Sequence, residues 1–162
     1  MEEHIYRLLD TFRVIPHVAA LAFAYVLAFP IGWDREQKER SAGLRTFPLV
    51  ALASCGFVQA TEGYVTGSPE AMARIVEGLI TGIGFIGGGA IVKYGGTVQG
   101  TATAAGLWAT GAIGAAVGLG SYDVAVAIAA FTVFTFWGLS PLKPVGPPAD
   151  DAAAPPPTKT PT

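Results

Sequence analysis

The sequence has little charge and few of the side chains that enzymes use for catalysis. Of its 162 residues 51% are apolar and 14% are charged, where a soluble domain has about 25% charged residues. The single cysteine, Cys55, lies in an apolar run, which excludes disulfides and thiolate metal sites. His4 and His17 have no nucleophile at useful spacing, so we expect neither enzyme activity nor a cofactor. The net charge of −2 argues against a nucleic-acid partner.

Long apolar stretches with at most one charged residue each fill most of the chain. Five segments are each long enough to cross the roughly 30 Å hydrocarbon core of a bilayer as a helix. They cover residues 14–33, 46–65, 75–92, 101–120 and 124–142. Because lipid offers no hydrogen bonds to the backbone, each segment must be helical. The sequence therefore predicts an all-α, polytopic membrane protein with five transmembrane helices within residues 14–140, surrounded by the lipid bilayer.

The two ends of the chain differ from the spans. Residues 1–13 have the periodicity of an amphipathic helix that lies in the membrane interface, and packing against another subunit is the alternative. Residues 141–162 contain most of the prolines and are predicted to be a disordered tail. Basic residues concentrate between the first two spans, so the positive-inside rule places the N-terminus outside and the C-terminal tail in the cytoplasm.

The stretch GIGFIGGG at 82–89 contains G-x-G-x-x-G, the phosphate-binding pattern of dinucleotide folds. No strand is predicted before it and no acid follows until Asp123, which disfavours a nucleotide site. Small residues four apart are instead typical of closely packed membrane helices, although a break in the helix is the alternative. The glycines predicted to pack helices together are Gly78, Gly82, Gly84, Gly87, Gly88, Gly114 and Gly118.

Glu77 is the most informative acid in the sequence. It lies about one turn inside the outer end of its predicted span, where an acid is costly. An ion pair with Arg74 would give it a structural role, and a functional role is the alternative. Glu62 lies near the outer end of its own span, and two carboxylates suit a hard cation such as Mg²⁺. Glu62 and Glu77 are therefore a candidate metal site.

The loop after the first span, within GWDREQKERSAGLRT, is a second concentration of charged residues. It is either a solvated basic loop or a cytoplasmic interaction surface. Further polar and aromatic candidates lie on the fourth span. The functional candidates of these two regions are Asp34, Arg35, Glu36, Gly43, Arg45, Thr46, Thr103 and Trp108.

Four segments resemble those of the MgtC/SapB family of membrane proteins. GWDRE at 32–36 and AGLRT at 42–46 resemble its first cytoplasmic loop, GIGFIGGG resembles its GIGFLGAG helix, and GTATAAGLW at 100–108 is similar to its GLTTAASLW segment. The resemblance covers the transmembrane domain, about residues 8–139, and we expect the family's C-terminal cytoplasmic domain to be lacking. It implies a bacterial inner-membrane protein linked to growth under magnesium limitation. For some members it implies the F-type ATP synthase as a partner.

These features together predict an inner-membrane protein that forms homo-oligomers through its glycine faces. We expect it to act by protein–protein interaction in adaptation to magnesium limitation or related stress. Transport of a cation such as Mg²⁺ is the alternative, and a membrane enzyme is less favoured. The two main hypotheses differ at Glu77, because Glu77→Gln should abolish flux in a transporter and leave ion movement unchanged in an interaction protein.

Overall fold

The computed structural model describes residues 14–38, 42–65, 67–94 and 97–142, which form five α-helices, one β-hairpin and a short 3₁₀ turn. The predicted all-α class is confirmed, whereas the predicted helix at 1–13 and the tail from residue 143 lie outside the described residues. The elements in chain order are α2 (Val14–Gln37), α3 (Thr46–Val65), α4 (Pro69–Gly89), β1 (Val92–Tyr94), β2 (Thr97–Gln99), α5 (Thr101–Gly118), α6 (Tyr122–Gly138) and η1 (Ser140–Leu142).

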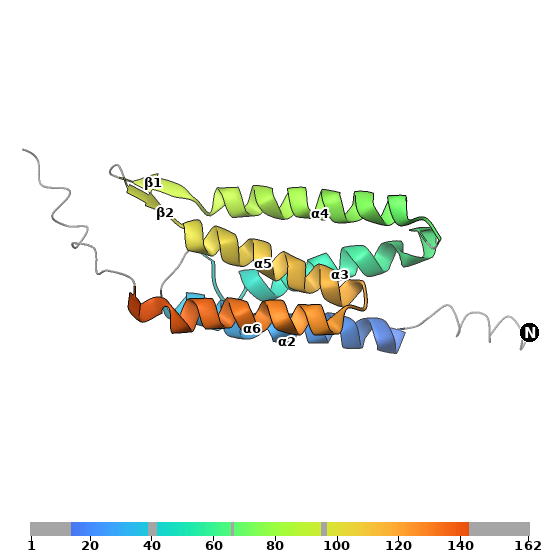
Figure 1. Ribbon diagram of the computed structural model, residues 1–162, viewed down its shortest axis with the longest axis horizontal. Helices are drawn as coiled ribbons and strands as arrows, with labels where there is room; N and C mark the ends of the chain where they lie inside the picture. Colours follow the sequence, from blue (N-terminus) through green and yellow to red (C-terminus); the bar gives the residue numbers. More distant parts are fainter. Residues whose placement is uncertain (1–13, 39–41, 66, 95–96, 143–162) are drawn as a thin grey trace, which may run out of the picture.

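The helices lie nearly parallel to one long axis, and successive helices run in opposite directions (Figure 1). Helix α5 is central and contacts the four other helices. Helices α2 and α6 pack together on one side of it, and α4 lies on the opposite side (Figure 1). The C-termini of α2, α4 and α6 lie at the same end of the bundle as the β-hairpin (Figure 1). We call this the hairpin end.

Glycines on α5 allow its neighbours to approach its backbone. A Cβ atom at Gly114 would overlap the carbonyl oxygen of Ala51 on α3, and one at Gly118 would lie 2.7 Å from the Cβ of Val58. Small residues at such contacts let helix backbones pack closely, which in lipid is a main source of association energy. Gly114 and Gly118 therefore lie where α3 approaches the backbone of α5 closely.

Helix α4 is attached more loosely, since Ile83 and Gly87 are its only buried residues. Gly87 lies against Ala104 of α5, at ordinary van der Waals distance. A Cβ atom at the other four glycines would meet nothing within 4 Å, so no helix of the described chain packs closely on them, and their packing role stays a prediction. These are Gly78, Gly82, Gly84 and Gly88. The helix also runs unbroken to Gly89, against the alternative of a break.

Helix α4 begins at Pro69, six residues before the predicted start at residue 75. The side-chain oxygen of Ser68 accepts a hydrogen bond from the Ala71 N–H at 3.3 Å, and proline is favoured in the first helical turn because it needs no N–H partner there. The predicted span started at residue 75 because the charged residues Glu70 and Arg74 come before it, although both belong to the same helix.

Other boundaries also differ from the predicted spans. Residue 92, predicted as the end of the third span, lies in β1, where Val92 pairs with Gln99. Helix α2 continues to Gln37, four residues beyond the predicted end. The last helix starts at Tyr122 and ends at Gly138 rather than at 142. The second predicted span, 46–65, coincides with α3.

Two of the described helices, α2 and α4, are long and apolar enough to cross a membrane. Helix α6 is also apolar but has 17 residues. Length and composition would allow these helices to cross a membrane, and the five crossings stay a prediction.

Gly114→Ala is expected to destabilise the fold by about 1–3 kcal/mol, because backbone atoms of α3 occupy the space that the new methyl group needs. The same change at the open Gly78 should be neutral or stabilise the protein by up to about 1 kcal/mol through helix propensity. Thermal unfolding midpoints in detergent micelles would measure both effects. Equal midpoints would contradict the close packing of α5 on α3.

Candidate functional site

A buried cluster of charged side chains lies near the C-terminus of α2, at the hairpin end. Asp34 and Arg35 are each 6% exposed. The Arg35 guanidinium donates two hydrogen bonds to Oδ2 of Asp34, from Nη2 at 2.7 Å and from Nε at 3.0 Å. The Lys38 ammonium lies 2.7 Å from the other carboxylate oxygen, Oδ1. Both oxygens of Asp34 are thus engaged by cations, as a buried carboxylate requires.

The cluster joins α2 to α6 through Phe136. The Arg35 guanidinium lies 3.9 Å from the centre of the Phe136 ring, within the range of a cation–π interaction. Lys38 donates a hydrogen bond to the Phe136 carbonyl oxygen at 3.2 Å. The same ring covers Gly106 of α5, where a Cβ atom would lie 2.7 Å from it and 3.0 Å from the Phe47 ring of α3. Four helices therefore meet at this point.

Glu36 holds the start of α3 against the end of α2. Its Oε2 accepts a hydrogen bond from the Leu44 N–H at 3.0 Å. A Cβ atom at Gly43 would overlap this carboxylate, so a larger residue there would require the Glu36 side chain to move. The Gly43 carbonyl in turn accepts hydrogen bonds from the N–H groups of Thr46 and Phe47, at 3.0 and 3.1 Å, which begin α3.

The two sequence motifs GWDRE and AGLRT therefore pack on each other. Asp34, Arg35 and Glu36 belong to a helix, and the first two are buried. For Asp34 and Arg35 the interpretation as a solvated loop is wrong, because each neutralises the other inside the bundle. Arg45, in contrast, is exposed at the start of α3.

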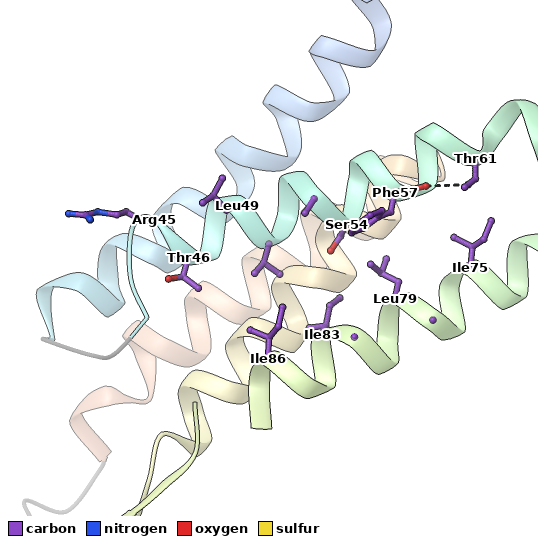
Figure 2. A pocket seen from close by; sticks show the side chains of 14 residues that line it. Arg45, Thr46, Leu49, Ser54, Phe57, Thr61, Ile75, Leu79, Ile83 and Ile86 are labelled. Atoms are coloured by element: carbon purple, nitrogen blue, oxygen red, sulfur yellow. Dashed lines mark hydrogen bonds between the residues drawn. The ribbon is translucent and has the colours of Figure 1, made fainter. Parts of the chain in front are cut away.

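Arg45 and Thr46 stand at one end of an open hollow between α3 and α4, which we call the α3–α4 groove (Figure 2). Its volume is about 690 Å³, and apolar side chains form most of its walls. Leu49 and Phe57 line it from α3, and Leu79 and Ile86 line it from α4 (Figure 2).

The two candidates on α5 lie apart from the charged cluster. Thr103 is buried, at 2% exposure, and Trp108 is 53% exposed beside a smaller hollow between α4 and α5. Within the described residues, neither side chain forms a hydrogen bond with Asp34, Arg35 or Lys38. Neither side chain is therefore part of the hydrogen-bonded cluster.

Glu77 lies deeper in its helix than the sequence predicted. Since α4 starts at Pro69, Glu77 is about 12 Å along the helix axis at 1.5 Å per residue. Glu77 and Arg74 are both exposed, and in the described part of the chain no ion pair joins them, contrary to the structural role predicted for Arg74. Glu62 is exposed in the last turn of α3.

Among the described residues, no group of three or more His, Cys, Asp or Glu side chains is placed to hold a metal ion. A Mg²⁺ site made by Glu62 and Glu77 alone stays a prediction.

Two residues of the charged cluster were not among the sequence candidates. Lys38 stands four residues after Asp34, a spacing that brings side chains together on a helix, so its pairing had a sequence signal. Phe136 had no such sequence signal, because it is 98 residues from Lys38 and its contacts depend on the tertiary packing of α6.

The family model described as "MgtC family" matches residues 21–145. The chain belongs to the MgtC family. It is 39% identical over 114 residues to Protein MgtC of Salmonella typhimurium, covering 70% of this chain and 48% of that protein. It is 37% identical over 131 residues to Protein MgtC of Brucella abortus, covering 80% and 54%. An uncharacterised Synechocystis protein is 41% identical over 106 residues, covering 65% and 44%.

The chain thus spans about half the length of the curated relatives that it matches. No solved structure matches it. Family membership and the two long apolar helices together indicate a membrane location.

Asp34→Asn is expected to destabilise the protein by about 3 kcal/mol, since it leaves the buried Arg35 guanidinium without its counter-ion. Asp123→Asn makes the same chemical change at an exposed position in the first turn of α6 and should cost about 0.5 kcal/mol or less. Denaturant unfolding of the two variants in micelles measures the difference. If Asp34→Asn unfolds at the same midpoint as Asp123→Asn, the cluster does not hold the helices together.

Proposed function

We propose that this is a multi-pass inner-membrane protein that acts by binding other membrane helices, in adaptation to magnesium limitation or related stress. The proposed contact surface is the outer face of α4, defined by Glu77, Thr81, Gly84 and Gly88. The observation that carries the proposal is an exposed acid about 12 Å along a helix long enough to cross a membrane, on this small-residue face.

The four residues lie on one side of α4. They are spaced by four, three and four positions, which places them above one another on a helix of 3.6 residues per turn. All four are exposed, and the two glycines have open space around them. The Thr81 hydroxyl donates to the Glu77 carbonyl oxygen at 2.9 Å, so it is satisfied within its own helix. The face is smooth enough for a second helix to approach closely.

The free-energy cost of exposing the Glu77 side chain to lipid favours a protein partner on this face. Helix α4, with 21 residues, is about 31 Å long, which matches the hydrocarbon thickness of a bilayer. An ionisable side chain within such a helix is costly, and it ordinarily faces other protein groups or water. Glu77 faces away from the chain's own helices, so a partner helix that supplies a polar group would remove this cost.

A second copy of the chain is the first partner we propose. Arg74 is exposed beside Glu77 on α4 and is not paired with it within the chain, so it is available to the Glu77 of another copy. A helix of another membrane protein, such as the F-type ATP synthase implied by the family resemblance, is the alternative occupant of the same face.

The proposed orientation places the N-terminus outside and the hairpin end in the cytoplasm. Basic residues of the described chain gather at the hairpin end, where Arg35, Lys38, Arg45 and Lys93 lie, while Arg74 lies toward the other end. This distribution agrees with the positive-inside rule.

Disulfide crosslinking of cysteine variants tests the contact surface. In a Cys55→Ala background, Gly84→Cys should give crosslinked dimers in native membranes, because the two outer faces meet. Ala130→Cys, at an exposed position in the middle of α6, is the matched control and should stay monomeric. Equal crosslinking at both positions would count against the α4 face.

A charge exchange sharpens the same test. Glu77→Lys should weaken the Gly84→Cys crosslink, since two basic residues would then meet on the face. Adding Arg74→Glu to that variant should restore the crosslink through the reversed pair. If the double variant stays as weak as the single one, Arg74 and Glu77 do not pair between copies.

Ion flux separates the interaction function from the alternative of cation transport. We expect no saturable Mg²⁺ uptake into proteoliposomes by the wild-type chain or by Glu77→Gln, compared with empty vesicles. Circular dichroism and protease protection would establish that the protein is folded and inserted. Saturable uptake that is lost in Glu77→Gln would overturn the proposal and make Glu77 a residue of a cation pathway.

A further inference from the structure

The α3–α4 groove is distinct from the outer face of α4 and lies on another side of the same helix. Gly78 and Gly82 line it, and a Cβ atom at either glycine would meet nothing within 4 Å. Its volume of about 690 Å³ falls within the 300–1,000 Å³ of typical small-molecule sites. The groove is therefore a recess, large enough for a ligand, that the chain's own side chains leave open.

The walls of the groove are apolar along its length. Ile86 of α4 points toward α3 (Figure 2), and Ile83 lines the groove where its side chain packs against Gly111 of α5. At the end away from the hairpin, the Thr61 hydroxyl donates to the Val58 carbonyl at 2.8 Å and is therefore satisfied within α3. No acid is among the residues that line the groove. The interior favours a hydrocarbon chain over a polar or cationic ligand.

The end of the groove beside the hairpin carries a positive charge. Arg45 is exposed there, next to Thr46, and extends away from the bundle (Figure 2). Among the described residues the Asp34 carboxylate forms ion pairs with Arg35 and Lys38, and the Glu36 carboxylate accepts a hydrogen bond from the Leu44 N–H. Arg45 has no ion pair within this part of the chain, so its charge is available to an anion.

The dimensions of the groove decide between a lipid chain and a helix. From Arg45 to Thr61 it extends along about 24 Å of α3, at 1.5 Å per residue. A helix with its side chains is about 10–12 Å across, so most of it would stand outside this groove. A single extended acyl chain is far thinner and can follow the groove from the membrane interface inward.

We infer that the α3–α4 groove binds an anionic phospholipid, with one acyl chain along the groove and the headgroup phosphate at Arg45. The apolar walls hold the chain, the open glycine positions make room for it, and Arg45 selects a headgroup with net negative charge. Arg45 lies at the start of α3, where a headgroup of the cytoplasmic leaflet would meet it in the proposed orientation.

Native mass spectrometry of the full chain in detergent tests the inference. Dioleoyl-phosphatidylglycerol is titrated against dioleoyl-phosphatidylcholine, which has the same chains but no net charge. We expect the wild-type protein to bind the anionic lipid more tightly. Arg45→Gln should weaken that binding about fivefold, the effect of one basic residue near an anionic lipid, and leave phosphatidylcholine binding unchanged.

A pair of glycine variants tests the acyl-chain position. Gly82→Leu fills the groove and should weaken binding of both lipids by at least about tenfold, equivalent to displacing two methylene groups. Gly63→Leu makes the same change at an open position near the end of α3 that lines neither the groove nor the outer face of α4, and it should bind both lipids as the wild type does. Ala53→Leu narrows the groove from α3 and serves as a second obstruction if Gly82→Leu does not fold.

Three results would overturn the inference. They are an anionic-lipid preference that survives Arg45→Gln, wild-type binding by the folded groove-filling variants, and equal losses in Gly82→Leu and Gly63→Leu. The lipid site and the proposed function fail separately, since crosslinking at Gly84 should be unaffected by Arg45→Gln.

Discussion

The buried carboxylate of Asp34 is the contact on which the hairpin end depends. It sits between the Arg35 guanidinium and the Lys38 ammonium, both at 2.7 Å. These cations in turn hold Phe136 of α6, whose ring covers Gly106 of α5 beside Phe47 of α3. An unpaired charge inside this packing would cost several kcal/mol, so the charged side chains of the cluster must keep their partners. One carboxylate thereby positions four helices relative to each other.

Helix α4 contributes no side chain to this network of Asp34, Arg35, Lys38 and Phe136, so it is held by fewer contacts than the other helices. It is held by α5 and, less extensively, by α3. Its two remaining sides stay uncovered, one toward the α3–α4 groove and one outward at Gly84 and Gly88. A helix fixed along one side only can offer separate surfaces to a lipid and to a protein partner. This division of α2, α3, α5 and α6 from α4 is the physical basis of both proposals.

Much of this architecture is readable from the sequence, because uncharged runs and helix ends are local properties. The second span coincides with α3, and the Ser68–Pro69 start of α4 has a recognisable capping pattern. The burial of Asp34 was not readable, because charge in a sequence indicates exposure unless its tertiary partners are known. Likewise, glycine spacing is similar on α4 and α5, yet Gly114 meets the backbone of α3 while Gly78 meets open space. Spacing predicts a surface suited to close approach, and only the fold determines whether a helix fills it.

Asp34 and Glu77 carry the same chemical group in opposite situations. Asp34 is enclosed and both of its oxygens have cationic partners within the chain. Glu77 is exposed about 12 Å along a helix whose length matches the hydrocarbon core, where water is absent. In a bilayer the cost of such a group must be offset by a neighbour, because no solvent is present to do so. The chain satisfies this requirement internally at Asp34, and in the proposed function a second helix satisfies it at Glu77.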